Sequence, residues 1–259
     1  MAIPRRWQRK ASPESAKDTV VSVAPTPYKN RLLQTLSVAD QEALRPWLRW
    51  SELGRGRVLV SPNERIQGVW FLEAGLSSIV AIGCNSQSIE VGISGRDGLV
   101  GVPVILDADR TPHQIFMQVA GHGYYVSAEN LDMLLDAYTG IRRVLLRYVQ
   151  TYSTQTAYSA MTNAMHSIEE RLARWLLMSH DRLDNDEIVL THDFLALMIG
   201  VRRPSVTIAL HTLEGLGLIK ATRGSIFIRE RAGLEDFAGT AYGTPEAEYR
   251  RLIGPLGQV

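Results

Sequence analysis

Two arginines, a proline and a serine stand together at residues 202–205, where a helix is predicted to begin. An arginine guanidinium is a planar donor that can hold a phosphate or the edge of a base through two parallel hydrogen bonds. Val206, Ala209, Leu210 and Leu213 recur at helical spacing and predict a buried face. The arginines, with Ser205, are therefore expected on the outer surface of this helix.

A second, shorter helix is predicted just before this one. Thr191 can cap its start, and Asp193 lies in its first turn, where negative charge suits the helix dipole. Gly200 allows the chain to reverse, and Pro204 is tolerated in the first turn of the next helix. Two helices joined in this way form a helix-turn-helix, whose second helix can enter the DNA major groove. The alternative is an ordinary helical hairpin within a core.

A short hairpin is predicted directly after the helix pair. We expect strands at Leu218–Ala221 and Ile226–Arg229 around a turn at residues 222–225. A helix-turn-helix followed by a small hairpin is a winged helix. Residues 202–231 carry six arginines and lysines against two glutamates. This local excess of positive charge suits phosphate contacts and favours DNA binding over the core hairpin.

The bulk composition sets wider limits. The chain has 259 residues, which leaves room for two domains, and its formal net charge is +1, so DNA binding must come from a local patch. The single cysteine, Cys84, excludes an intrachain disulfide and an all-cysteine metal cluster. Neither an 18-residue apolar run nor an apolar signal-peptide core is present, so we expect a cytoplasmic protein without a membrane partner.

The composition changes along the chain in five steps. A polar, proline-bearing start with Arg5, Arg6, Arg9 and Lys10 predicts a tail that touches an anion or is merely solvated. Ser37 marks a helix start, and from residue 51 to about 126 short apolar runs alternate with glycine-bearing turns, which predicts a β-sandwich or roll. The expected divisions are a flexible basic tail at 1–27, a β-roll at 28–137, a dimerisation helix at 138–166, a winged helix at 167–231 and a helical extension at 232–259.

The long helix of the third division carries a seam with alternating spacings of four and three. Its members are Ile141, Leu145, Tyr148, Tyr152 and Gln155. This heptad pattern, on a helix of about 25 residues spanning roughly 37 Å, predicts pairing with a second chain. The seam then turns small and polar, and Gln155 and Thr156 are open to two interpretations: buried hydrogen-bonding positions or part of a ligand site.

This order of elements resembles the Crp/Fnr family of bacterial transcription regulators. The similarity is closest at 191–228, and looser at a β-hairpin at 63–75 and at 95–103, where the family carries its phosphate-binding cassette. It implies an α+β protein with a jelly-roll-like β-roll, a long dimerisation helix and a C-terminal winged helix-turn-helix. It further implies a homodimer on near-palindromic double-stranded DNA, with RNA polymerase as a partner and no enzymatic activity.

The resemblance also assigns the DNA contacts. Arg203 takes the place of a family arginine that reads guanine, whereas Pro204 replaces a frequent glutamate and Ile208 replaces a second arginine. The family's usual half-site therefore does not carry over whole. The predicted DNA-binding residues are Thr191, Arg202, Arg203, Pro204, Ser205, Thr207, Ile208, His211 and Arg223.

The β-roll departs from the members of the family that bind cyclic AMP. In them a glutamate follows the cassette glycine and binds the ribose, but here Gly101 is followed by Val102, which accepts no hydrogen bond. Arg110 is displaced from the phosphate-binding position. We therefore expect no cyclic AMP binding, and we expect neither a cofactor nor a metal. The candidates for an effector pocket are Gly101, Val102, Arg110, Thr111, His113, Gln155 and Thr156.

Two other classes of function stay open. One is a metabolite- or nucleotide-sensing module that acts mainly through a protein partner. The other is an enzyme with a site in the β-roll, which is disfavoured because no nucleophile–base pair or acid pair stands out. The glycines at 95, 98 and 101 are not followed by a predicted helix, so they do not form a dinucleotide fingerprint. Cys84 is either inert packing or a redox-sensitive thiol.

Overall fold

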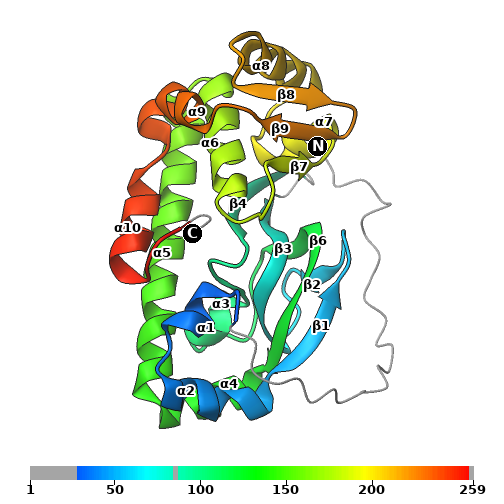
Figure 1. The fold of residues 1–259 in the computed structure, drawn as a ribbon. Helices are drawn as coiled ribbons and strands as arrows, with labels where there is room; N and C mark the ends of the chain where they lie inside the picture. The colour runs from blue at the N-terminus through cyan, green and yellow to red at the C-terminus, as the bar shows by residue number, and fades with distance from the viewer. Residues whose placement is uncertain (1–27, 84–86, 257–259) are drawn as a thin grey trace.

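The computed structural model of the chain describes residues 28–83 and 87–256, and of Asp193 it describes only the backbone. The predicted tail at 1–27 and Cys84 lie outside the described residues, and so does the predicted dipole interaction of the Asp193 side chain. Figure 1 shows a β-sheet unit joined by one long helix to a smaller helical unit with a hairpin.

The N-terminal unit is built on a six-stranded antiparallel sheet. Its main order is β1-β6-β3-β4, with β2 paired to β6 and β5 paired to β3. The strands are β1 (Arg49–Leu53), β2 (Val58–Val60), β3 (Gly68–Ile82), β4 (Ser88–Ser94), β5 (Leu99–Val100) and β6 (Gln114–Ser127). The helices of this unit are α1 (Arg31–Thr35), α2 (Val38–Leu44), η2 (Arg45–Trp47), α3 (Val102–Ile105) and α4 (Ala128–Ala137). Ser37 and Ser127 cap α2 and α4 through their hydroxyls.

Two strands are longer than the sequence predicts. Gly75 does not end a strand: it has φ of +86° and lies inside β3, where the register with β6 shifts on both sides of it. Gly121 of β6 faces this bulge, and a Cβ there would lie 2.0 Å from the carbonyl oxygen of Ala74. Glycine is therefore used for close backbone approach across the pair and not for a corner. Residues 102–105, predicted to continue a strand, form α3 after Gly101 at φ +107°.

The winged unit follows the long helix α5 (Thr139–Met165). Its elements are α6 (Ile168–His180), β7 (Glu187–Val189), α7 (His192–Met198), α8 (Arg203–Gly215), β8 (Ile219–Thr222) and β9 (Ser225–Ile228). The chain ends with α9 (Arg231–Ala238), η3 (Gly239–Ala241) and α10 (Thr244–Leu252), and α10 packs on α5. The predicted α+β architecture, with a β-roll, a long helix and a C-terminal helix-turn-helix, is confirmed.

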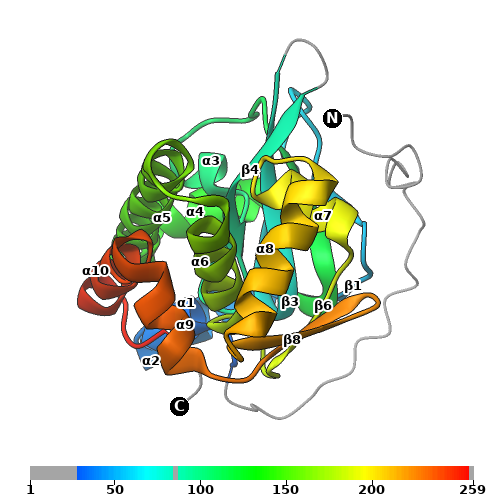
Figure 2. The same ribbon diagram turned by 90° about the horizontal axis from the view of Figure 1, so that it is seen from above.

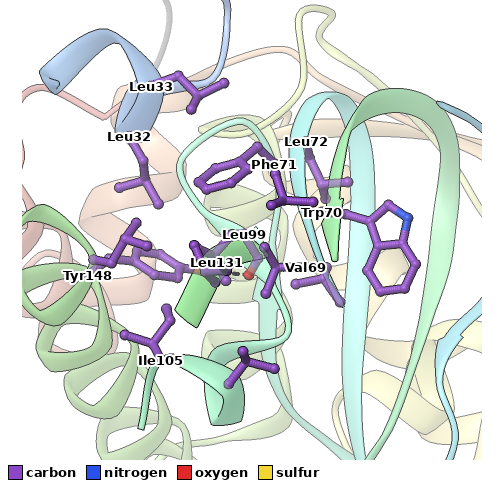
Figure 3. Close-up of a cluster of buried hydrophobic side chains, with 14 of the residues drawn as sticks. Leu32, Leu33, Val69, Trp70, Phe71, Leu72, Leu99, Ile105, Leu131 and Tyr148 are labelled. Carbon is purple, nitrogen blue, oxygen red and sulfur yellow. Dashed lines mark hydrogen bonds between the residues drawn. The ribbon is translucent and has the colours of Figure 1, made fainter. Parts of the chain in front are cut away.

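Two hydrophobic cores hold these units. Figure 3 shows the first, in which side chains from α1, β3, β5, α3, α4 and α5 meet, among them Phe71, Leu131 and Tyr148. The second core joins α6, α7, α8 and the wing, and it also takes in Leu76 and Phe116 from the sheet. Because this core crosses between the units, the winged unit is packed directly against the β-roll.

Candidate functional site

The helix pair at 191–213 forms as the sequence predicts, with one difference. Gly200 has φ of +63° and reverses the chain, and Arg202 takes the N-cap position of α8 with Pro204 in its first turn. Thr191 occupies the N-cap position of α7, but its hydroxyl accepts no capping hydrogen bond. The predicted capping role of the Thr191 side chain is therefore wrong, and that side chain is exposed.

The first helix of the pair is fixed by the β-roll. Phe194 meets Phe116 of β6 edge to face, with ring centroids 5.8 Å apart. The Ser78 hydroxyl of β3 lies 3.6 Å from the Met198 sulfur, and the Arg171 guanidinium donates to the carbonyl of Ile199 at the end of α7. These contacts set the position of α7 and, through the tight turn, that of α8.

Helix α8 has one buried face and one open face. Val206, Ala209, Leu210 and Leu213 are each at most 1% exposed, as predicted. Helix α8 lies at the end of the molecule remote from α4 in Figure 1, and in Figure 2, seen from that end, it lies in front of the sheet. All nine residues predicted to bind DNA are at least partly exposed. The Thr207 hydroxyl is shared with its own helix and with α7, because it lies 3.3 Å from both the Arg203 carbonyl oxygen and His192 Nδ1.

The hairpin beside α8 is confirmed, with each strand shifted by one residue from the prediction. β9 pairs with β8 on one side and with β7 on the other. The Ala221 N–H donates to the Glu214 carboxylate of α8 at 3.1 Å, which ties the wing to the helix. Arg223 is exposed in the turn, next to Gly224 at φ +92°. The wing thus carries an exposed cation at its turn.

A second candidate site is a cavity of about 260 Å³ between the β-roll and α5. Five of the predicted pocket residues line it: Gly101, Val102, Thr111, His113 and Thr156. Most of the other lining is apolar and comes from four strands and two helices, with Ile79, Val91, Leu99, Val100, Pro103, Ile115 and Tyr152. The Thr111 hydroxyl lies 2.9 Å from His113 Nδ1, and burial lowers the pKa of His113. Burial therefore favours the neutral form of the His113 ring.

Two predicted pocket residues lie elsewhere. Arg110 is exposed and forms an ion pair with its neighbour Asp109, with nitrogen and oxygen 3.0 Å apart. Gln155 uses its side-chain amide to bond both backbone groups of Ile93 in β4, at 2.8 and 3.2 Å. Gln155 therefore joins α5 to the sheet, and Arg110 brings no charge to the cavity.

The predicted dimer seam also has a different role in the chain. Ile141, Leu145, Tyr148 and Gln155 are all buried within the same chain, and Tyr152 is half-buried against the same core. The Tyr148 hydroxyl lies 3.0 Å from the Ser94 hydroxyl. The assignment of these five residues to an interface with a second chain is therefore corrected: they pack α5 onto its own β-roll.

Sequence reasoning missed a polar junction between the two units. Trp175 of α6 donates its indole N–H to Glu90 of β4 at 2.7 Å, and burial raises the pKa of Glu90 to about 8. Nearby, Arg182 and Asp97 form an ion pair at 2.8 Å with each side chain only 3% exposed. Each pair links residues about 85 positions apart, so no local sequence pattern could have revealed them.

The C-terminal extension joins the same junction. Arg231 of α9 bonds both Asp181 and the Tyr242 hydroxyl, at 2.7 and 2.8 Å. Tyr249 of α10 enters the first core and donates its hydroxyl to the carbonyl of Asp97. The extension therefore fastens the winged unit to the β-roll.

The described residues lack two further kinds of feature. No helix in that part of the chain is long and apolar enough to cross a membrane. Within the same residues, no group of three or more histidine, cysteine, aspartate and glutamate side chains could hold a metal ion.

The fold and the helix pair define a winged helix-turn-helix protein with a β-roll. Three solved structures share this fold. A transcriptional regulator of the Crp/Fnr family from Eubacterium rectale has a TM-score of 0.63 at 17% identity, covering 80% of this chain and 97% of that one. The c-di-GMP-responsive global regulator CLP of Xanthomonas campestris has 0.61 at 15%, covering 74% and 99%. FixK2 from Bradyrhizobium japonicum has 0.64 at 13%, covering 74% and 98%.

The sequence itself matches a family model over part of the chain. Residues 170–237 match the Crp-like helix-turn-helix domain. No curated protein matches the chain. The chain therefore carries a Crp-like helix-turn-helix domain on the fold of the Crp/Fnr transcription regulators, as its sequence resemblance implied.

Proposed function

We propose that this protein is a sequence-specific regulator of transcription that binds double-stranded DNA through the outer face of α8. The observation that carries the proposal is the two-sided character of this helix. Its apolar side is fully buried, while Arg202 and Arg203 stand exposed at its start. The first turns of a recognition helix are the part that reaches the base edges.

The arginines of this surface have two kinds of role in this proposal. Arg203 reads a guanine through its O6 and N7 atoms, the commonest specific contact in the major groove. Arg202 and Ser205, at the entry of α8, and Arg223, on the wing, contact phosphates and hold the helix in register. Thr191 and His211 are exposed at the two ends of this surface and belong to the proposed DNA-binding residues.

The division of the chain into domains follows the same proposal. The β-roll at 28–137 is the effector domain, 138–166 the dimerisation helix and 167–231 the DNA-binding domain. The family-model match runs to residue 237 and so includes most of α9. The helical extension at 232–259 then holds the DNA-binding domain through Tyr242, whose hydroxyl donates to Asp181, and reaches the β-roll through Tyr249.

The protein acts as a homodimer in this proposal, but through the other face of α5. A second heptad row, with spacings of four and three, runs along its exposed side and comprises Leu146, Gln150, Ser153, Ala157, Ala160 and Ala164. Leu146 is 44% exposed, and the small residues above it allow two helices to approach closely. Two α8 helices set about 34 Å apart would then read a near-palindrome.

The dimer is tested by its mass in solution. Ala160→Glu should place a charge in the seam and shift the mass at micromolar concentration from dimer to monomer. Met133→Glu, at an exposed apolar position on α4, is the matched control and should stay dimeric. A wild-type monomer at that concentration would reject the dimer.

The cavity in the β-roll is the effector site in this proposal. The residues that line it, all within the described part of the chain, include no arginine or lysine. A phosphate would find no cation there, and the Val102 side chain gives a ribose hydroxyl no acceptor. The volume of about 260 Å³ lies below the usual range of roughly 300–1,000 Å³. The site therefore suits a small, neutral, mainly apolar compound and not cyclic AMP.

The function is tested by selecting bound fragments from genomic DNA with the purified protein and no added ligand. Enrichment of one near-palindromic motif is expected, followed by loss of its binding in Arg203→Ala. A module that acts only through a protein partner would enrich no motif. Recruitment of RNA polymerase at a bound site in the bacterial cytoplasm is the remaining part of the proposal, and transcription from a selected fragment in vitro tests it.

A further inference from the structure

The exposed side of α8 has an apolar centre. Pro204, Ile208 and His211 follow one another at spacings of four and three, so they lie on one line along the helix. Val206, Ala209 and Leu210 occupy the opposite side and are buried. The line therefore runs along the middle of the surface that faces away from the core.

Ile208 is the exposed apolar residue in the middle of this line. It is 63% exposed and lies one turn beyond Pro204. Neither side chain has a hydrogen-bond donor or acceptor. Pro204 and Ile208 can thus discriminate between bases only by shape and apolar contact.

The edges of the same surface are positively charged. Arg202 and Arg203 are exposed at the start of α8, and Lys220 and Arg223 are exposed on the wing. An apolar strip between cations fits the major groove, where phosphates form the walls and base edges the floor. The one apolar group that bases present on that floor is the C5-methyl of thymine.

We propose that α8 reads thymine methyl groups with Ile208 and Pro204, beside the guanine read by Arg203. This inference rests on the proposed function. It specifies the target as a half-site in which a guanine is accompanied by thymines. A helix with hydrogen-bonding residues at positions 204 and 208 would instead read cytosine or a second guanine. His211 ends this line, and its imidazole can make polar contacts.

The test removes the methyl groups without changing base pairing. A duplex is first selected from a random pool, and its half-site thymines are then replaced one at a time by deoxyuridine. Wild-type binding should weaken by about fourfold at a contacted thymine, the effect of exposing one methyl-sized group. Replacement of thymines outside the half-sites should leave the affinity unchanged.

Two variants assign the effect to the side chain. Ile208→Ala should bind the thymine and deoxyuridine duplexes equally well, because the contact is already absent. Leu216→Ala removes an apolar side chain that is 57% exposed at the end of α8, off the line, and should keep the full methyl sensitivity. Both positions are exposed, so neither change should alter the circular dichroism spectrum or the unfolding midpoint.

The possible outcomes distinguish a failure of the proposed function from a failure of the methyl readout. If the protein selects no motif at all, the proposed function fails. If it selects a motif but deoxyuridine nowhere weakens binding, or if Ile208→Ala stays as sensitive as the wild type, the methyl readout is overturned and DNA binding stands. Reselection with Ile208→Arg should replace a thymine by a guanine at the corresponding step, and an unchanged motif would also contradict the proposal.

Discussion

The outer face of α8 and the cavity of the β-roll are opposite kinds of site. The first is open, edged with arginines and made from residues close together in the chain. The second is enclosed by mostly apolar side chains that come from β3, β4, β5, β6 and α5. A charged open surface suits a large polyanion, and a small apolar cavity suits a neutral molecule. The two sites therefore differ in the kind of ligand that their chemistry suits.

The two sites are also joined more tightly than a hinge would allow. A shared hydrophobic core, the Trp175–Glu90 hydrogen bond and the Arg182–Asp97 ion pair all cross between them. A ligand in the cavity can alter α8 only if it changes this junction. Substitutions in the junction should therefore have larger effects than changes at either site.

The largest effect is expected from breaking the buried ion pair. Asp97→Asn leaves the Arg182 guanidinium buried without its counter-charge and should lower the free energy of unfolding by about 3–5 kcal/mol. The exposed pair Arg142–Asp136 is the control, and Asp136→Asn should cost less than about 1 kcal/mol. Chemical denaturation of both variants measures the difference, and equal losses would mean that the junction does not hold the two regions together.

A pH dependence is expected from Glu90. Its pKa of about 8 in the folded chain lies above the ordinary value of 4.5, because burial favours the neutral form. The folded state then holds a proton that the unfolded state has lost, so the stabilisation is complete below pH 4.5 and disappears as the pH rises to about 8. The slope from this group is about 1.4 kcal/mol per pH unit within that window.

Glu90→Gln removes this slope and keeps the acceptor for the Trp175 indole. Denaturation at pH 5, 6, 7 and 8 should show the wild type losing stability relative to the variant at each step. The half-buried Glu248, whose pKa is lowered by its hydrogen bond to Arg251, provides Glu248→Gln as a control that should not flatten the curve. Parallel curves for wild type and Glu90→Gln would contradict the assignment.

The recognition surface is examined by Arg203→Ala. Loss of a bidentate contact to guanine should cost about 1–3 kcal/mol on the selected duplex and relax the preference at one base position. Binding to random duplex should change much less. Fluorescence anisotropy with both duplexes at one salt concentration measures the two losses, and equal losses would remove Arg203 from base reading.

A smaller and less selective effect is expected from the wing. Arg223→Ala should weaken binding to selected and random duplexes alike and reduce the slope of log affinity against log salt by about 1, because one phosphate contact is lost. The measurement is a salt titration. A selective loss on the selected duplex alone would instead place Arg223 at a base edge.

The smallest effect is expected from cyclic AMP. At 1 mM it should raise the free energy of unfolding by less than about 0.4 kcal/mol, the value for a ligand with a Kd of 1 mM. Thermal unfolding with and without the nucleotide measures the shift. A larger shift would show that the cavity accepts a phosphate without a cation, and the contrast between the two sites would be lost.

Local patterns account for what could be predicted from the sequence. The periodicity of Val206, Ala209, Leu210 and Leu213 depends only on helix geometry, and Gly200 marks the turn by its own conformational freedom. The cavity is different, because strand pairing brings Ile79 beside Ile115, and the packing of α5 on the sheet brings Thr156 to them. Its polar rim was found through the resemblance to known regulators, and its apolar lining was not found.

The two heptad rows of α5 show where periodicity stops being informative. Both rows have spacings of four and three, so spacing alone cannot tell which one faces the chain's own sheet. Their composition can: the row with Ile141, Leu145 and Tyr148 is the more apolar and is buried by the larger surface, the β-roll. The row with Leu146 and Ala157 is left outside.

The turn at residues 95–98 is hydrogen-bonded to residues from both the N-terminal and the C-terminal parts of the chain. The Arg31 N–H donates to the Arg96 carbonyl at 2.8 Å, and Asn30 donates to the Gly98 carbonyl at 2.7 Å. From the other end Tyr249 donates to the carbonyl of Asp97. During synthesis the first two contacts can form as soon as the β-roll leaves the ribosome, whereas the third must wait for α10, more than 150 residues later. A chain that stops before α10 therefore lacks one of the three contacts at this turn, and the loss falls in the N-terminal unit, far along the chain from the truncation.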